Sequence, residues 1–313
     1  MWNLSITSFK QITAFSIFLF SLLIFNCSEN SNSPSGNDDS RPIDEEPPTN
    51  ENVIQVNKLN DHFTIFSEPI GTSVNATLFS GSEGNLMIDT GYDTMVGELR
   101  DSINGINPVG VQFIINTHTD TDHRGGNNVL SGGGTILGHV NGELVYQNSN
   151  PGADVLAIDR SYIFNFNGES IRCLLRTNNG HTESDIIVYF PESKIICTGD
   201  LYISESFPSV SFARGATVQA HLMTLNYLIN YFPDDITYIP GHGRPSTKEE
   251  LTAYYSMVEA TVEIVRNEMA TGRSLEDIQR SNVLAEWNSW GTYFVDYNTN
   301  SWIRQIYLSY YGL

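Results

Sequence analysis

The chain has 313 residues, with 36 Asp or Glu against 16 Lys or Arg, which gives a formal net charge of -20. This length suits one large domain or two small ones that can bury a core. The acidic balance argues against nucleic acid and against anionic lipid as partners, because binding either of them needs clustered Lys and Arg.

The first 27 residues have the pattern of an export signal. Lys10 precedes an apolar stretch, residues 12–25, that is too short for a comfortable membrane span. The stretch resembles a bacterial lipoprotein signal, with Cys27 as the residue that is cleaved and lipidated. We expect the protein to be exported to the periplasm or the cell surface and anchored to a membrane by lipid on Cys27. An uncleaved membrane anchor is the alternative, and it also places the body of the protein outside the cytoplasm.

Residues 28–52 are predicted to be a disordered linker. They are rich in Ser, Asn, Pro and acidic residues and almost free of apolar ones, so they cannot bury a core. The chain is uniformly globular in composition from Val53 onward. We therefore expect one catalytic domain over residues 53–313, tethered to its anchor by the linker.

Alternating and apolar runs predict the strands and helices of the first half. The predicted strands are residues 54–59, 63–66, 76–80, 86–89, 111–115 and 135–137. A helix is predicted over residues 93–103, because Met95, Leu99 and Ile103 fall on one helical face. A short helix is predicted near residues 127–130.

The same patterns recur in the second half. The predicted strands are residues 162–166, 170–175, 185–190, 194–198 and 236–239, and the predicted helices are residues 217–231, 248–270 and 302–311. Ser246 or Thr247 is expected to cap the long helix, and Gly272 to end it. Strands followed by helices, twice over, predict a mixed α/β fold with two β-rich layers in the middle and helices outside.

Two cysteines, Cys173 and Cys197, lie inside apolar runs that are predicted to be strands. We expect two separate buried thiols, since free Cys packs as a small apolar residue. A disulfide is the alternative, because an exported protein experiences oxidising conditions.

Residues 116–126 read Asn-Thr-His-Thr-Asp-Thr-Asp-His-Arg-Gly-Gly and follow a predicted buried strand. Four side chains in this segment can bind a metal, namely His118, Asp120, Asp122 and His123. Crowded carboxylates repel one another and are costly to bury, and a divalent cation reverses both penalties. The segment therefore predicts a metal site.

Three further residues share the same design, because each follows a predicted strand and stands beside a glycine that lets the backbone turn. They are His181 in Gly180-His181-Thr182, Asp200 in Thr198-Gly199-Asp200, and His242 in Gly241-His242-Gly243. Four such elements in this order are hard to produce by chance.

These motifs, together with Asp89-Thr90-Gly91 after its own strand, resemble those of the metallo-β-lactamase superfamily of hydrolases. The resemblance covers nearly all of residues 53–313 and implies an αββα sandwich with two metal ions at one edge. It implies that His118, Asp120 and His181 hold the first ion, that Asp122, His123 and His242 hold the second, and that Asp200 bridges both. Two divalent ions are expected, with zinc first and iron or manganese as alternatives.

The chain departs from the family pattern H-x-H-x-D-H at one position, where Asp120 replaces the second His. A carboxylate can still ligate zinc, but it makes the first site more anionic, which favours iron or manganese more than an imidazole would. From the sequence, Asp120→His is expected to preserve or raise activity with zinc.

The ligand set predicts a dinuclear hydrolase of ester, lactone, thioester or amide bonds in a small-molecule substrate. A hydroxide between the two metals would be the nucleophile, and Asp122 would be catalytic by orienting it or moving its proton. The loop of residues 203–216, which contains Arg214, is either a wall of the substrate pocket or a plain surface loop.

Three alternatives remain open. A β-lactamase is one, although such enzymes in this superfamily commonly carry Cys or Ser where Asp200 stands. A non-catalytic metal-binding protein with a weakened first site is the second, and a diiron redox protein is the third.

Overall fold

The computed structural model describes residues 54–69, 72–176, 179–291 and 297–311. The chain separates into two units, Met1–Pro47 and Pro48–Leu313, and every described residue belongs to the second. The predicted signal segment, residues 1–27, and the predicted linker, residues 28–52, lie outside the described residues. Among the described helices, none has both the length and the apolar character needed to cross a bilayer.

The larger of two sheets has seven strands that follow one another in chain order. They are β1 Gln55–Lys58, β2 Phe63–Ser67, β3 Asn75–Gly81, β4 Gly84–Ile88, β5 Val111–Ile115, β6 Thr135–His139 and β7 Asp154–Ile158. Neighbours from β1 to β4 are antiparallel, and neighbours from β4 to β7 are parallel. The parallel strands send the loops that follow β5 and β6 to one edge of the sheet.

The smaller sheet has the strand order β12-β11-β10-β9-β8. Its strands are β8 Tyr162–Phe166, β9 Glu169–Leu175, β10 Ile186–Phe190, β11 Ile195–Ile203 and β12 Thr237–His242. Only β11 and β12 run parallel to each other.

The two sheets pack face to face because their strands are apolar on both faces. In β10, Ile186 and Val188 belong to the core between the sheets, whereas Ile187 belongs to the core under the helices. This alternation follows from the two-residue repeat of a strand. Between the sheets, the Phe63 ring centroid lies 4.7 Å from that of Phe79 and 4.9 Å from that of Phe190.

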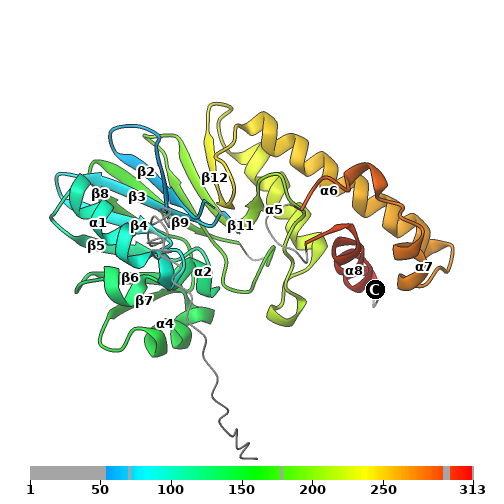
Figure 1. The fold of residues 1–313 in the computed structure, drawn as a ribbon, viewed down its shortest axis with the longest axis horizontal. Helices are drawn as coiled ribbons and strands as arrows, with labels where there is room; N and C mark the ends of the chain where they lie inside the picture. The colour runs from blue at the N-terminus through cyan, green and yellow to red at the C-terminus, as the bar shows by residue number, and fades with distance from the viewer. Residues whose placement is uncertain (1–53, 70–71, 177–178, 292–296, 312–313) are drawn as a thin grey trace, which may run out of the picture. The chain divides into compact units, whose positions relative to one another are not determined.

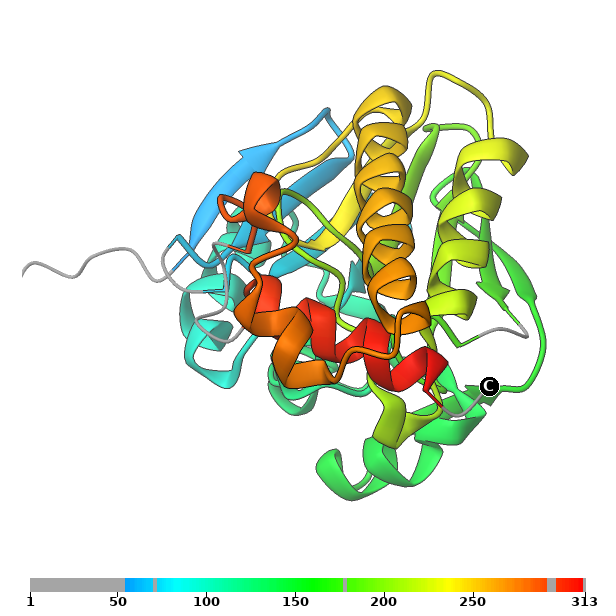
Figure 2. The ribbon, with the colours of Figure 1, turned by 90° about the vertical axis from the view of Figure 1, so that its right-hand side faces the viewer.

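Helices cover both outer faces, which confirms the predicted αββα sandwich (Figure 1). The larger sheet is covered by α1 Val96–Ile106, α3 Asn127–Leu130 and α4 Glu143–Ser149, and the short α2 Thr121–Arg124 follows β5. The smaller sheet is covered by α5 Val218–Tyr231, α6 Lys248–Ala270 and α8 Thr299–Tyr310, with α7 Leu275–Arg280 packed on α8. Figure 2 shows α5 and α6 side by side, with α8 running across one end of α6.

One predicted boundary is wrong in a way that matters for function. The sequence places Asp200 after a strand that ends at Thr198, but β11 continues to Ile203 and Asp200 lies inside it. The pairing of β11 with β12 is irregular on both sides of Gly199, which has a φ of 53°. This irregularity turns the strand at Asp200 without ending it.

Both cysteines of the described chain are free and buried, as predicted. Cys173 lies in β9 and Cys197 in β11, and Val188 of the intervening β10 is paired with both of them. Burial raises the pKa of the Cys173 thiol to about 12. These side chains therefore serve as small apolar residues of the core.

Candidate metal centre

The seven residues that the sequence singles out converge at one edge of the sandwich. His118 and Asp120 lie in the loop after β5, and Asp122 and His123 lie in α2. His181 lies in the loop between β9 and β10, Asp200 in β11, and His242 at the end of β12. Their side-chain donor atoms form three overlapping groups that are compact enough to hold a metal ion.

The first group contains His118, Asp120 and His181. The Asp120 Oδ2 atom lies 3.4 Å from His181 Nε2 and 3.6 Å from His118 Nε2. Both imidazoles are 1% exposed, whereas the Asp120 side chain is 27% exposed. This group therefore faces the surface through its carboxylate.

The second group contains Asp122, His123 and His242. The two imidazole Nε2 atoms lie 3.3 Å apart, and Asp122 Oδ2 lies 3.8 Å from that of His123 and 3.5 Å from that of His242. Both imidazoles are fully buried. All three donor atoms thus point to one small volume.

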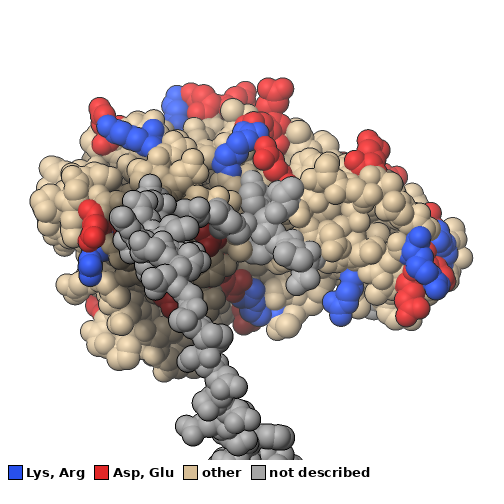
Figure 3. Space-filling model, in the orientation of Figure 1, with Lys and Arg blue, Asp and Glu red and all other residues tan. Residues whose placement is uncertain are grey.

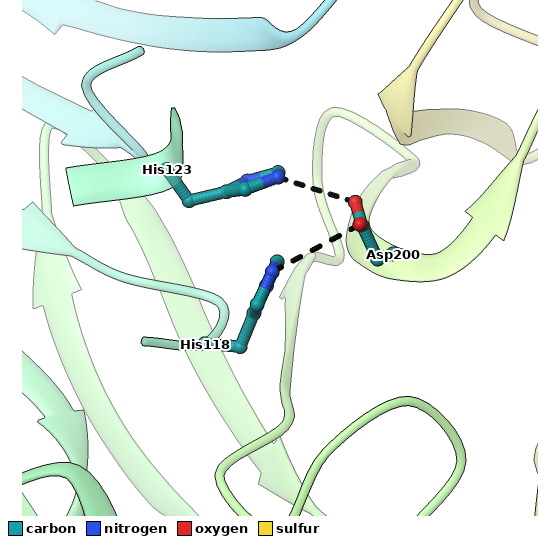
Figure 4. Close-up of side chains that lie close together, drawn as sticks. All are labelled: His118, His123 and Asp200. Carbon is teal, nitrogen blue, oxygen red and sulfur yellow. Dashed lines mark ion pairs between the residues drawn. The ribbon is translucent and has the colours of Figure 1, made fainter. Parts of the chain in front are cut away.

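Asp200 lies between the two groups. Its Oδ2 atom lies 3.7 Å from His181 Nε2 and 4.0 Å from His118 Nε2, whereas its Oδ1 atom lies 3.2 Å from His123 Nε2 and 3.3 Å from His242 Nε2. Figure 4 shows the Asp200 carboxylate directed toward His118 and His123 at once. One oxygen therefore faces each group, as a bridging carboxylate requires.

Two of the histidines are fixed in orientation by backbone carbonyl groups. His181 Nδ1 donates to the Ser209 oxygen at 2.7 Å, and His242 Nδ1 donates to the Thr72 oxygen at 2.7 Å. A carbonyl oxygen can only accept, so each Nδ1 carries the proton. In a neutral ring each Nε2 is then left as an acceptor that faces the cluster.

Asp89 fixes the other two histidines, and the sequence analysis did not foresee this role. Its Oδ2 atom lies 2.8 Å from His123 Nδ1 and accepts from the Thr117 hydroxyl at 2.7 Å. Since that hydroxyl donates to Asp89, it accepts from His118 Nδ1 at 3.0 Å. The signal was present in Asp89-Thr90-Gly91, which places an acidic residue directly after a buried strand.

Without a cation, the carboxylates of the cluster raise the pKa of two of its buried imidazoles, His123 and His181. Burial opposes the charged form of His181, but the Asp120 and Asp200 carboxylates outweigh burial and raise the pKa of His181 to about 9. Burial likewise opposes ionisation of Asp200, yet the charges of His242 and His123 hold the pKa of Asp200 well below its usual value. A bound cation would replace the protons on His123 and His181, because metal ligands bind in their deprotonated forms.

Unsatisfied buried atoms give a further indication that these side chains could hold a metal. Three buried atoms, His118 Nε2, His181 Nε2 and Asp200 Oδ1, have no hydrogen-bond partner among the described residues. Buried polar atoms rarely remain unsatisfied, and each such atom needs an explanation. Imidazole nitrogens and carboxylate oxygens, here from four histidines and three aspartates, are donors that bind zinc and related divalent metals.

Arg214, from the loop between β11 and α5, pairs with Asp120 through two hydrogen bonds. Residues 209–214 line a cavity of about 590 Å³ together with Asp120, Tyr297 and four residues of α8. The part of the predicted loop from Ser209 onward is therefore a cavity wall. No sequence pattern links Arg214 to Asp120, which lies 94 positions earlier.

Gly241 offers a direct test of how Asp200 is placed. A Cβ atom at this position would lie 2.8 Å from the Gly199 carbonyl carbon and 2.9 Å from the Asp200 nitrogen, and it would also meet the Asp200 carboxylate. Gly241→Ala is therefore expected to displace Asp200, to cost about 1–3 kcal/mol of stability, and to weaken metal binding. Chemical denaturation and zinc titration measure the two effects. Gly97→Ala is the control, because a Cβ atom at Gly97 of α1 meets nothing within 4 Å.

Comparison with known proteins identifies the family and the fold. Residues 69–242 match the family model of the metallo-β-lactamase superfamily. A metallo-β-lactamase type 2 of Bacillus cereus is 24% identical over 202 residues, which cover 61% of this chain and 77% of that protein.

Solved structures share the fold. A metallo-β-lactamase from Pontibacter korlensis has a TM-score of 0.57 and 21% identity, and the match covers 66% of this chain and 99% of that one. A stereoselective inverting sec-alkylsulfatase from Pseudomonas sp. has a TM-score of 0.62 and 16% identity, and the match covers 83% of this chain and 50% of that one.

Proposed function

The chain belongs to the metallo-β-lactamase superfamily, and on this basis we propose that it is a dinuclear metal-dependent hydrolase. In this proposal His118, Asp120 and His181 would hold the first ion, Asp122, His123 and His242 would hold the second, and Asp200 would contribute to both sites. The observation that carries it is the convergence of seven donor side chains, four histidines that are buried and three aspartates, whose ligand atoms lie within reach of one another. Zinc is the expected metal, and iron or manganese is the alternative.

Divalent ions in such sites supply Lewis acidity and lower the pKa of water to about 7. The chain's own part in the reaction is to exclude water, to hold the donors and to move a proton. The Asp122 side chain is 15% exposed, and its carboxylate makes no hydrogen bond among the described residues. Because Oδ2 is the atom that faces His123 and His242, Oδ1 remains to accept a proton from the attacking water and return it to the leaving group.

We propose an ester, lactone, thioester or amide of a small molecule as the substrate. The open cavity beside Asp120, lined by residues 209–214 and α8, supports a small-molecule substrate. A β-lactam substrate is the second candidate, and the likeness to a protein named metallo-β-lactamase type 2 favours it. Asp200 weighs against the β-lactam, since β-lactamases of the superfamily commonly carry Cys or Ser there.

A substrate panel with and without chelator tests the proposal. The panel holds a lactone, an aryl ester, a thioester, an amide and nitrocefin, plus a secondary alkyl sulfate because a sec-alkylsulfatase shares the fold over 83% of this chain. Turnover of an acyl substrate that stops with chelator and returns with zinc, iron or manganese supports the proposal. Turnover that persists in chelator contradicts it, and metal binding with no turnover of any substrate favours the non-catalytic alternative.

We also propose that the protein is exported and lipid-anchored through Cys27, and that it does not bind nucleic acid. The apolar run of residues 12–25 before Cys27 supports the anchor. The net charge of -20 weighs against nucleic acid, and on the face drawn in Figure 3 the Lys and Arg side chains stand singly or beside acidic ones. Cys27→Ala should release the protein from the membrane fraction, and unchanged fractionation would contradict the lipid anchor.

A further inference from the structure

Arg214 uses all of its guanidinium nitrogens inside the protein. One terminal nitrogen donates to Asp120 Oδ1, the other donates to Asp120 Oδ2 at 2.9 Å, and Nε donates to the Ser211 hydroxyl at 3.0 Å. A bidentate Arg–carboxylate pair of this kind is stronger and more directional than a single ion pair. Three of the five guanidinium N–H donors are engaged in this way, and two of them hold the Asp120 carboxylate.

The atom that Arg214 holds is the one that faces the first group. Asp120 Oδ2 accepts from Arg214 and lies 3.4 Å from His181 Nε2 and 3.6 Å from His118 Nε2. The Asp120 side chain is 27% exposed and the Arg214 side chain 33% exposed, so the pair is partly shielded from water. Among the described residues, the other polar partners of the Asp120 carboxylate are the two imidazoles, so Arg214 holds this carboxylate from the side of the cavity.

The segment that carries Arg214 also fixes His181. The Ser209 carbonyl oxygen accepts from His181 Nδ1 at 2.7 Å, and the Ser211 nitrogen donates to the His181 oxygen at 3.0 Å. The Arg214 nitrogen closes the turn by donating to the Ser211 oxygen at 3.0 Å. Residues 209–214 therefore support both His181 and Asp120 from one short stretch of chain.

Charge explains why an arginine stands here. The family pattern has a neutral imidazole where this chain has Asp120, so the substitution alone would add one negative charge to a cluster that already holds Asp122 and Asp200. The Arg214 cation cancels that added charge. The pair of Asp120 and Arg214 thus has the same net charge as the histidine that it replaces.

We propose that Arg214 is a positioning residue of the first metal site, where it fixes Asp120 and compensates its charge. The inference rests on the proposed metal centre and names a residue of this chain that the family pattern does not contain. It also changes the expectation for Asp120→His. That single substitution would leave the guanidinium without its carboxylate next to a divalent ion, and it is now expected to weaken zinc binding at the first site.

Zinc affinity, measured by competition with a chromophoric chelator on the full chain, tests the inference. Arg214→Met is expected to weaken the first site by about 10- to 100-fold, which is the usual effect of removing a partner that holds a ligand. Arg214→Lys keeps the positive charge but cannot donate two parallel hydrogen bonds to Asp120. Its zinc affinity should therefore lie between that of wild type and that of Arg214→Met. The double variant Asp120→His with Arg214→Met should bind zinc more tightly than either single variant, because a neutral imidazole needs no compensating cation and no guanidinium is left without its carboxylate.

Arg304→Met is the matched control, since Arg304 lines the same cavity and makes no hydrogen bond or ion pair with the seven donor residues in the part of the chain that the structure describes. Its zinc affinity should equal that of wild type. Circular dichroism and melting temperature establish that each variant is folded.

The outcomes separate this inference from the proposed function. Wild-type affinity in Arg214→Met, or equal loss in the single and double variants, would overturn the role of Arg214 and leave the metal centre standing. A wild-type chain that holds no zinc at all would overturn the proposed function itself.

Discussion

Replacing Asp122 by Asn is expected to lower kcat/KM by about 10²- to 10⁴-fold on whichever substrate the panel identifies. The substitution keeps the size of the side chain and removes its charge and its capacity to accept a proton. The carboxylate makes no hydrogen bond among the described residues, so the fold does not depend on it. The melting temperature of the metal-free protein should therefore remain that of wild type.

The control for Asp122→Asn is Glu183→Gln, which removes an exposed carboxylate from the same loop as His181. Its kinetic constants should equal those of wild type. Steady-state kinetics and metal analysis on the same preparations distinguish loss of proton transfer from loss of the ion. A wild-type rate in Asp122→Asn would show that Asp122 is not catalytic. The proposed hydrolysis would then lack a residue that accepts the proton of the attacking water.

Replacing Asp89 by Ala is expected to have the largest effect on stability, about 3–5 kcal/mol. Asp89 is 3% exposed and accepts three hydrogen bonds, from the Thr117 nitrogen, the Thr117 hydroxyl and His123 Nδ1. The carboxylate also raises the pKa of His123 together with Asp200, against the opposing effect of burial. Its loss leaves buried donors unsatisfied and a buried imidazolium with one counter-charge fewer.

Urea denaturation of the metal-free protein measures this stability change, and zinc titration measures its consequence for the centre. The affinity for zinc should fall about 10- to 100-fold, because His118 and His123 lose the contacts that orient them. Asp93→Ala is the control, since Asp93 is an exposed carboxylate a few residues further along the chain. A stable Asp89→Ala variant with wild-type zinc affinity would mean that His118 and His123 are oriented without it.

The sequence identified much of the site because the chemistry of metal ligands is visible in residue types. His118, Asp120, Asp122 and His123 stand together in one segment, and His181 and His242 each follow a glycine at a predicted turn. All seven predicted donor residues converge in the structure. Their assignment as ligands of two ions stays a prediction that metal analysis must test.

The sequence could not predict the contacts that hold those donor side chains in position. Arg214 reaches Asp120 across 94 positions, and Asn75 donates to the Pro240 oxygen across 165. Such contacts depend on how the loops pack after the sheets have formed, and no local pattern records them. Ser209 accepts the hydrogen bond from His181 through its backbone carbonyl. The identity of the side chain at position 209 therefore does not predict this contact.

Local signals explain which elements were predicted well. The helix over residues 248–270 was predicted at both ends, because Thr247 caps it and Glu250 completes a capping box. By contrast, α4 and β7 were not predicted. In β7 the alternate residues are exposed or only partly buried, and α4 buries only Tyr146, so neither has a strong apolar pattern. The continuation of β11 through Asp200 was not predicted, because glycine is common in turns and Gly199 therefore suggested the end of a strand. The residues after Gly199 are assigned to the strand by their pairing with β12, which the local sequence does not show.

Metal content of the purified chain, determined after removal of all ions and reloading with zinc, tests the central claim most directly. The account predicts two ions per wild-type chain, and one ion per chain in His181→Ala and in His242→Ala, since these variants disable different groups. Fewer than two ions per wild-type chain, or two ions retained in both variants, would contradict a dinuclear centre built from these side chains.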